Sequence, residues 1–305
     1  MNNIEVVVLL MEISKKFADE DSLTQTYSQS NLLHNLQSFR DLEKMIGLTE
    51  VKKNLVEIIA FAIVQSRRNE QHLKTCPAVL HMIFKGNPGT GKTTVARTLG
   101  KIFNEIGLLT KGHLVEVERA DLVGEFIGHT AQKTREMIKK SLGGIMFVDE
   151  AYSLAQGGEK DFGREAISTI VKAMEDNRDN FIVILAGYSA EMEFFMRTNP
   201  GLRSRFPIQI NFPDYDSEDL FQIALQMYNE REYELSSKCR WKLRNQLNEF
   251  VKVRHPHSGN ARYARNLVEK SIRLQALRIV ERKILTRREL ISIEESDLPA
   301  GLLQV

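Results

Sequence analysis

The chain has 305 residues, enough for one large domain or two modest domains with a buried core. Hydrophobic residues make up 42% of it and charged residues 27%, which is an ordinary composition for a soluble globular protein. The formal net charge of +2 is close to balance, so the totals give no basis for a nucleic-acid footprint or a polybasic membrane surface.

The N-terminal segment and the cysteines bear on where the protein resides. The apolar run near the start is too short to span a bilayer and has Glu5 and Glu12 within or beside it. It also lacks the basic region and the small-residue cleavage site of a signal peptide. We expect residues 1–35 to be a small appendage or a flexible arm of a cytoplasmic protein without a membrane span. Cys76 and Cys239 fit no metal or redox spacing, so we expect free thiols, with a disulfide as the alternative.

The middle of the chain alternates between helical and strand patterns. From Asp41 apolar residues recur near a period of 3.6, which predicts helix interrupted by a turn at residues 46–48. Five short apolar runs predict strands at 80–85, 113–118, 144–149, 181–186 and 207–212. Helices are expected at 92–106, 130–142, 163–176 and 190–198. This alternation predicts βαβ units and a mostly parallel sheet between layers of helices.

After Pro213 the strand pattern stops and the apolar residues follow a helical period. Helices are expected at 214–232, 236–251 and 260–283, followed by a weak strand in "ELISIEE". The sequence therefore predicts three parts. They are an appendage at 1–35, an α/β nucleotide-binding domain at 36–213 and a smaller helical lid domain at 214–305.

The pattern Gly86-x-x-x-x-Gly91-Lys92-Thr93 is a full P-loop, placed directly after an expected strand and before an expected helix. Its glycines let successive backbone N–H groups point inward at phosphate oxygens, and the helix N-terminus adds its positive dipole end. We therefore expect ATP here, with Lys92 on the β- and γ-phosphates and the Thr93 hydroxyl on Mg²⁺. The expected nucleotide-binding residues of the loop are Gly86, Asn87, Pro88, Gly89, Thr90, Gly91, Lys92, Thr93 and Thr94.

A second motif, "IMFVDE", lies at the end of a strand that is expected to be buried. A P-loop alone binds nucleotide, whereas hydrolysis also needs a carboxylate that holds the metal and a group that orients water. Asp149 is the candidate for the Mg²⁺ hydration shell and Glu150 the candidate for the general base. The alternative is an acidic strand end that caps the next helix.

These two motifs, their spacing and the helical domain that follows resemble the AAA+ ATPases. The resemblance implies a five-stranded parallel sheet in the order 5-1-4-3-2, with helices on both faces and a helical lid. It also implies that nucleotide binds between the two domains at a subunit boundary. A head-to-tail interface then closes copies of the chain into a homo-hexameric ring.

Three arginines are assigned by the resemblance. "NPGLRSRF" resembles the arginine-finger segment, in which an arginine of a neighbouring subunit neutralises charge on the transferring phosphoryl group. Arg205 is the first choice and Arg203 the second. "GNARYARNLVEK" resembles the sensor-2 segment of the lid, in which Arg262 would contact the γ-phosphate. The alternative for all three is a solvated surface arginine.

The resemblance is looser around the base and at the first sensor. "MIGLTEVKK" is similar to the segment whose backbone holds adenine, which places Ile46, Gly47 and Leu48 nearest the base. Many relatives have Asn or Thr after the fourth strand, whereas Tyr188 or Ser189 lies nearest that position in this sequence. A Tyr188 hydroxyl could orient water.

Phe126, Ile127 and Gly128 lie where this family carries its pore loop, usually an aromatic, an aliphatic and a glycine. Copies of the loop around a central channel would grip an extended polypeptide by van der Waals contact, and Gly128 would let the loop bend. The alternative is that Phe126 and Ile127 pack under the next helix as a hydrophobic staple.

Longer phrases such as "VERADLVGEFIGHTAQKT" and "GGIMFVDEAYSL" resemble one clade of the family. That clade contains the red-type Rubisco activases and a sporulation protein of spore-forming bacteria, and the chain is more similar to the latter. We expect a Mg-ATP-dependent ATPase that remodels a protein client in spore development, with no nucleic-acid partner. A red-type Rubisco activase that responds to a sugar bisphosphate is one alternative. A nucleotide-gated switch or scaffold without threading is the other.

Overall fold

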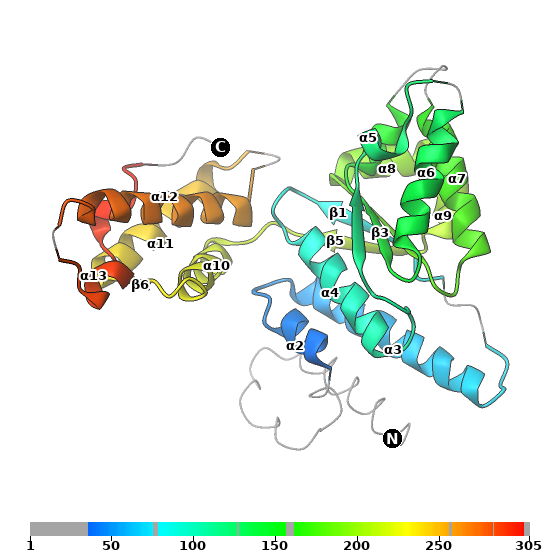
Figure 1. Ribbon diagram of the computed structural model, residues 1–305, viewed down its shortest axis with the longest axis horizontal. Helices are drawn as coiled ribbons and strands as arrows, with labels where there is room; N and C mark the ends of the chain where they lie inside the picture. Colours follow the sequence, from blue (N-terminus) through cyan, green and yellow to red (C-terminus); the bar gives the residue numbers. More distant parts are fainter. Residues whose placement is uncertain are drawn as a thin grey trace. The chain divides into compact units, whose positions relative to one another are not determined.

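The computed structural model describes residues 36–75, 79–126, 128–156, 162–255, 258–282 and 284–301 (Figure 1). The expected appendage at 1–35 and Ile127 of the expected pore loop lie outside these ranges. The chain divides into two compact units. One combines the residues up to Gly86 with Lys92–Phe212, and the other combines Asn87–Gly91 with Pro213–Val305. Both ends of the short 87–91 segment therefore fall inside the P-loop.

The first unit is built on a parallel sheet of five strands in the order β2-β3-β4-β1-β5, which is the order that the resemblance implied. The strands are β1 (Met82–Gly86), β2 (Leu114–Val117), β3 (Ile145–Val148), β4 (Ile182–Gly187) and β5 (Ile208–Phe212). In β1, which lies between β4 and β5, Met82 pairs with Ile184 on one side and Ile208 on the other. Because all strands run the same way, the segments that follow β1, β3 and β4 meet at one edge of the sheet.

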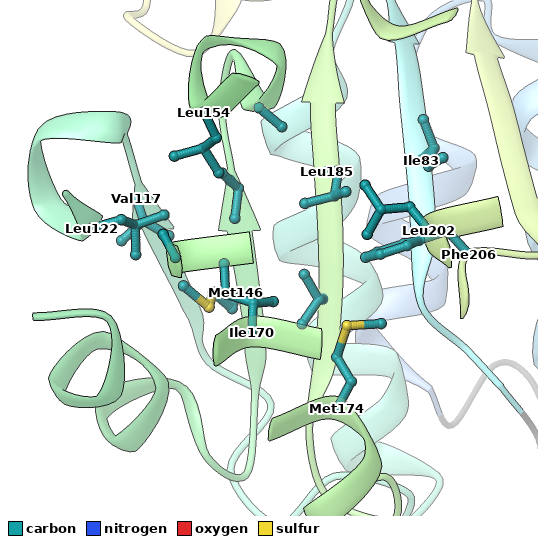
Figure 2. Packing of buried hydrophobic residues seen from close by; sticks show 14 of the residues in the cluster. Ile83, Val117, Leu122, Met146, Leu154, Ile170, Met174, Leu185, Leu202 and Phe206 are labelled. Atoms are coloured by element: carbon teal, nitrogen blue, oxygen red, sulfur yellow. The ribbon is translucent and has the colours of Figure 1, made fainter. Parts of the chain in front are cut away.

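One face of the sheet packs against a helical layer through a continuous apolar cluster (Figure 2). The layer consists of α5 (Arg119–Leu122), α6 (His129–Ser141), η2 (Ala151–Ala155), α7 (Gly163–Asp176), α8 (Ser189–Thr198) and α9 (Pro200–Arg205). Ile83 and Leu185 from the strands meet Met174 and Phe206 from this layer, and all four are buried. The short elements α5, η2 and α9 were not expected, because each has too few residues to show a helical period.

The other face is covered as well. Met82 and Phe84 alternate with Ile83 along β1 and are fully buried, as are Ile145 and Phe147 on β3. The helices on this side are α2 (Gln37–Glu43), α3 (Thr49–Glu70) and α4 (Lys92–Glu105), of which α4 contacts β2 and β3 while α3 contacts β5. Burial on both faces explains why these strands are nearly continuous in apolar residues.

The second unit is mainly helical. It contains α10 (Ser217–Asn229), α11 (Ser237–Val253), α12 (Ala261–Ile279), α13 (Arg287–Ile291), a short parallel pair β6 (Glu234–Leu235) and β7 (Ser292–Ile293), and η3 (Glu295–Asp297). The rings of Phe250 and Tyr263 stack at 3.8 Å between centroids. Asp297, which is 1% exposed, accepts from Arg278 Nε at 2.7 Å and so ties η3 to α12. Cys239 is a buried free thiol, as expected, whereas Cys76 lies outside the described residues.

The weak strand expected in "ELISIEE" is partly wrong. Its first three residues end helix α13, and only Ser292 and Ile293 form a strand. The helix begins with a capping box, in which the Glu289 carboxylate accepts from Thr286 N at 2.8 Å and Thr286 Oγ1 accepts from Glu289 N at 3.3 Å. This cap stabilises a helical turn in a segment whose apolar residues favour a strand. Nowhere in the part of the chain that the structure describes is a helix both long and apolar enough to cross a membrane.

Candidate active site

The P-loop joins β1 to α4 at the carboxyl edge of the sheet. Its backbone turns at Gly89 and Gly91, where φ is 71° and 94°. Thr90 is fully buried, and its hydroxyl donates to the Asn87 carbonyl at 2.8 Å, which closes the turn. The Lys92 ammonium donates to the Gly86 carbonyl at 2.7 Å, across the mouth of the loop. The loop is therefore shaped by its own side chains, with the lysine at its opening.

The first turn of α4 carries the hydroxyls that were expected near the metal. Thr93 is half-buried and Thr94 is exposed. Within the described ranges, no group of three or more His, Cys, Asp or Glu side chains could hold a metal ion. Mg²⁺ binds proteins through one or two oxygen ligands and takes phosphate and water oxygens for the rest. The single carboxylate of Asp149 and the Thr93 hydroxyl fit this demand.

Asp149 and Glu150 follow β3 at the same edge of the sheet. Asp149 N donates to the Val117 carbonyl at 3.0 Å, which extends the pairing with β2 by one residue. Asp149 is half-buried and its Oδ1 accepts from Glu150 N at 3.0 Å. Glu150 is exposed and has φ 46° and ψ 44°, a left-handed conformation that non-glycine residues adopt at a cost. This turn therefore places two adjacent carboxylates directly after the end of β3.

Tyr188, the residue nearest the expected first sensor, begins α8 and is half-buried. Its ring stacks with that of Tyr152 at 5.9 Å between centroids. Burial, and after it the nearby Glu150 carboxylate, raises the pKa of the Tyr152 hydroxyl above its ordinary value, so this hydroxyl stays protonated as a donor. Tyr152 was not predicted as a site residue, although it lies only three residues after Asp149, which was predicted.

The turn that was expected to hold adenine precedes α3. Gly47 and Leu48 both have positive φ, at 63° and 58°. Leu48 is buried, whereas Ile46 is half-buried. Lys52, which is 7% exposed, donates its ammonium protons to the carbonyls of Glu43 and Met45. A buried lysine therefore fixes the backbone of this turn.

In the second unit, Arg262 lies in the first turn of α12 and is exposed. Its backbone N–H donates to the Gly259 carbonyl at 2.7 Å. This hydrogen bond fixes the start of the helix from which the Arg262 side chain extends.

Two family models match the chain from residue 82 onward. The model described as the ATPase family associated with various cellular activities (AAA) matches residues 82–214, and the AAA lid domain matches 216–304. Stage V sporulation protein K of Bacillus subtilis (strain 168) is 56% identical over 260 residues, covering 85% of this chain and 81% of that protein. The chain belongs to the AAA family of ATPases. It is accordingly an ATP hydrolase, and the predicted resemblance is confirmed.

Other relatives of this AAA ATPase carry different names. Protein CbbX of Cereibacter sphaeroides is 42% identical, over 85% of this chain and 84% of that protein. The chloroplastic ribulose bisphosphate carboxylase/oxygenase activase of Cyanidioschyzon merolae is 40% identical, over 85% and 89%. Among solved structures, the FIGL-1 AAA domain in complex with ADP matches with a TM-score of 0.56 at 17% identity, covering 83% of this chain and 80% of that chain. The last likeness supports the fold alone.

The two finger candidates of this AAA ATPase differ in their surroundings. Arg205 donates to Glu175 Oε1 at 3.0 Å from Nε and 2.6 Å from Nη2, and from Nη1 to the Gly201 carbonyl at 3.0 Å. Arg203 is exposed and lines a cleft of about 400 Å³, and its side chain makes no hydrogen bond or ion pair to any described residue. Arg205 was the first choice because it directly precedes Phe206, and its pairing with Glu175 could not be predicted from the sequence.

The pore-loop candidate of this AAA ATPase has a fixed base and an exposed tip. Gly124 N donates to the buried Thr130 hydroxyl at 2.9 Å, which ties the start of the loop to α6. Phe126 is 65% exposed, and its ring meets only the edge of the His129 ring, at 5.4 Å, among described aromatic neighbours. Phe126 is therefore not packed beneath α6. Gly128 has φ 85° and is exposed.

Proposed function

We propose that this AAA ATPase is a Mg-dependent remodelling machine that closes into a homo-hexameric ring and pulls on a protein client through the central pore. We place it in the cytoplasm, in spore development, without a nucleic-acid partner. The 56% identity to a sporulation protein supports the pathway. The near-neutral charge supports a protein client over a nucleic acid.

The roles of the site residues follow from their chemistry. Lys92 and the P-loop N–H groups bind the phosphates, while Thr93 and Asp149 hold Mg²⁺, which supplies charge neutralisation to the phosphates when bound. Glu150 orients and deprotonates the attacking water, since its carboxylate is exposed next to Asp149. Tyr188 completes the site beside them as the first sensor.

The base and the remaining charges involve the flanking segments. Ile46, Gly47 and Leu48 contact adenine, and Arg262 contacts the γ-phosphate from the lid. We place the appendage, the nucleotide-binding domain and the lid at 1–35, 36–213 and 214–305. A neighbouring copy of the chain supplies the arginine finger. The ion pair of Arg205 with Glu175 favours Arg203 for that role, because the Arg203 guanidinium has no partner among the described residues and is ready to meet a phosphate.

The exposure of Phe126 carries the remodelling proposal. An exposed aromatic side chain gains free energy when a partner covers it, and it supplies much contact area for little loss of side-chain entropy. With Ile127 and Gly128 beside it, Phe126 can contact a polypeptide of any sequence. A nucleotide-gated switch would not need such a contact.

Phe126→Ala tests this proposal. We expect ATP hydrolysis without client to change by no more than about twofold, because an exposed side chain adds little to stability. Stimulation of the ATPase by casein, used as an unfolded polypeptide, should disappear. Phe194→Ala is the matched control, because Phe194 is equally exposed, at 69%, but lies on α8. If casein stimulates both variants equally, the pore-loop role is wrong.

A client trap distinguishes threading from switching. Glu150→Gln should hold ATP without hydrolysing it and retain client in a pull-down from sporulating cells. The same trap with Phe126→Ala should lose the proteins that a pore loop grips. A nucleotide-gated switch predicts that both traps retain the same proteins.

A Rubisco activase is the second candidate, favoured by the relatives at 42% and 40% identity. It shares the pulling mechanism and differs in the client. Stimulation of the ATPase by ribulose bisphosphate would support it, and a lack of response would favour the sporulation role.

A further inference from the structure

A buried amide in the second unit makes an unusual number of hydrogen bonds. Asn260 is 1% exposed. Its Nδ2 donates to Asp214 Oδ1 at 2.8 Å, to the Ser258 carbonyl at 3.1 Å and to the Pro88 carbonyl at 3.3 Å. Its Oδ1 accepts from Tyr215 N at 3.1 Å. Every polar atom of the side chain is therefore engaged, and one of its partners belongs to the P-loop.

Neighbouring groups of the same unit bind the next two carbonyls of the loop. Ala261 N donates to the Gly89 carbonyl at 3.1 Å, and the Tyr215 hydroxyl donates to the Thr90 carbonyl at 3.3 Å. With the contact from Asn260 to Pro88, three successive carbonyls of the loop are held by donors from the C-terminal segment of the chain. Residues 87–91 belong to that compact unit.

The geometry of the peptide bond links these carbonyl contacts to the direction of the N–H groups that would bind phosphate. In a trans peptide the C=O of one residue and the N–H of the next point in opposite directions. Fixing the carbonyls of Pro88, Gly89 and Thr90 therefore directs the N–H groups of Gly89, Thr90 and Gly91 the other way. Those N–H groups are the ones that a P-loop offers to phosphate oxygens.

The network also has a charged centre and a strained member. Asp214 Oδ1 accepts from Asn87 Nδ2 at 2.9 Å as well as from Asn260. One carboxylate therefore links the P-loop residue Asn87 to Asn260. The backbone of Asn260 has φ 43° and ψ −123°, which non-glycine residues rarely adopt. Such a conformation persists where the surroundings fix it, and it recurs at functional sites.

We propose that Asn260 is a positioning residue for ATP binding. It holds the Pro88 carbonyl, beside the contacts of Ala261 and Tyr215 with the next two carbonyls, so that the loop N–H groups face the phosphates. The inference rests on the proposed role of the P-loop in binding nucleotide. It assigns to the residue before the sensor-2 helix a function that is independent of Arg262.

Asn260→Ala tests the proposal, with Asn266→Ala as its control. Asn266 lies on the helix that Asn260 precedes, is exposed, and its side chain makes no hydrogen bond to a described residue. We expect Asn260→Ala to weaken ADP binding about tenfold or more, measured by calorimetry. Adenosine binding, measured by ligand-observed NMR, should stay within about twofold of wild type, since adenosine has no phosphate. Equal losses for both ligands, or ADP binding equal to that of Asn266→Ala, would overturn the proposal.

A charge exchange tests the pairing with Asp214. Asn260→Asp alone places two carboxylates in contact and should weaken ADP binding more than Asn260→Ala does. Adding Asp214→Asn removes the repulsion between the two carboxylates but leaves the Pro88 carbonyl without its donor. We therefore expect the double variant to bind ADP no more tightly than Asn260→Ala does, and wild-type ADP binding by the double variant would contradict the role of the Pro88 contact.

Tyr215→Phe keeps the test open if Asn260 variants do not fold. It removes only the hydroxyl on the Thr90 carbonyl, and we expect about threefold weaker ADP binding with unchanged adenosine binding. Unchanged ADP binding would overturn the role of the carbonyl contacts. If wild-type protein itself fails to bind ADP, the P-loop assignment has failed, which is a different result from each of these.

Discussion

Gly89 and Gly128 have similar backbone conformations, but Gly89 is closely packed and Gly128 is not. Both have positive φ, at 71° and 85°. A Cβ on Gly89 would lie 2.1 Å from the Gly259 carbonyl oxygen and 2.9 Å from Arg262 N, whereas a Cβ on Gly128 would meet nothing within 4 Å. The first glycine is needed for close packing, and the second only for its conformation. The phosphate loop is thus held on its outer side, while the tip of the pore-loop candidate is open to a partner.

Gly89→Ala should have the largest effect. The methyl group overlaps backbone atoms that cannot move aside easily, and the positive φ adds strain. A combined cost of about 3 kcal/mol corresponds to roughly hundredfold weaker nucleotide binding. Calorimetry with ADP measures it, and far-UV circular dichroism checks that the sheet is retained. Wild-type affinity would mean that the loop is not packed as tightly as the glycine contact indicates.

Lowering the pH should reduce the free energy of unfolding through His81, a residue that lies in neither loop. His81, which precedes β1, is 6% exposed, and its Nδ1 accepts from Val183 N at 3.1 Å. Burial lowers its pKa from 6.5 to about 4, although a backbone hydrogen bond from its ring to Met174 opposes the shift. The unfolded chain therefore takes up this proton at a higher pH than the folded protein does. Stability is complete above pH 6.5 and falls as the pH drops toward 4.

Between pH 7.5 and pH 5 we expect this histidine to cost about 2 kcal/mol of unfolding free energy. Urea denaturation at the two pH values measures the difference. His81→Gln should remove most of that difference, whereas His72→Gln should not, because His72 is exposed. Equal pH dependence in wild type and His81→Gln would show that another group is responsible.

Gly128→Ala should have the smallest effect. Only the cost of a left-handed alanine applies, about 1 kcal/mol, because no neighbouring atom is displaced. We expect ATP hydrolysis within about twofold of wild type. A loss of nucleotide binding comparable to that of Gly89→Ala would contradict the difference between the two loops.

The features that sequence predicted are local ones. The P-loop and "IMFVDE" each lie within a few consecutive residues, and the continuous apolar runs mark strands covered on both faces. Pairings between distant residues could not be predicted, because nothing in one segment specifies its partner. The contact of Asn260 with Pro88 joins residues 172 positions apart, and the pairing of Arg205 with Glu175 joins residues 30 apart. The second of these changes which arginine is favoured as the finger.

The buried ammonium of Lys52 has a consequence for nucleotide exchange. It holds the carbonyls of Glu43 and Met45 as part of the folded structure, so the turn at Gly47 and Leu48 is preorganised before any base arrives. The conformational entropy of that turn is lost once, when the chain folds, and not again with each ATP that binds. If this turn contacts adenine as proposed, an ATPase that releases ADP and rebinds ATP in every cycle can do both without reordering it.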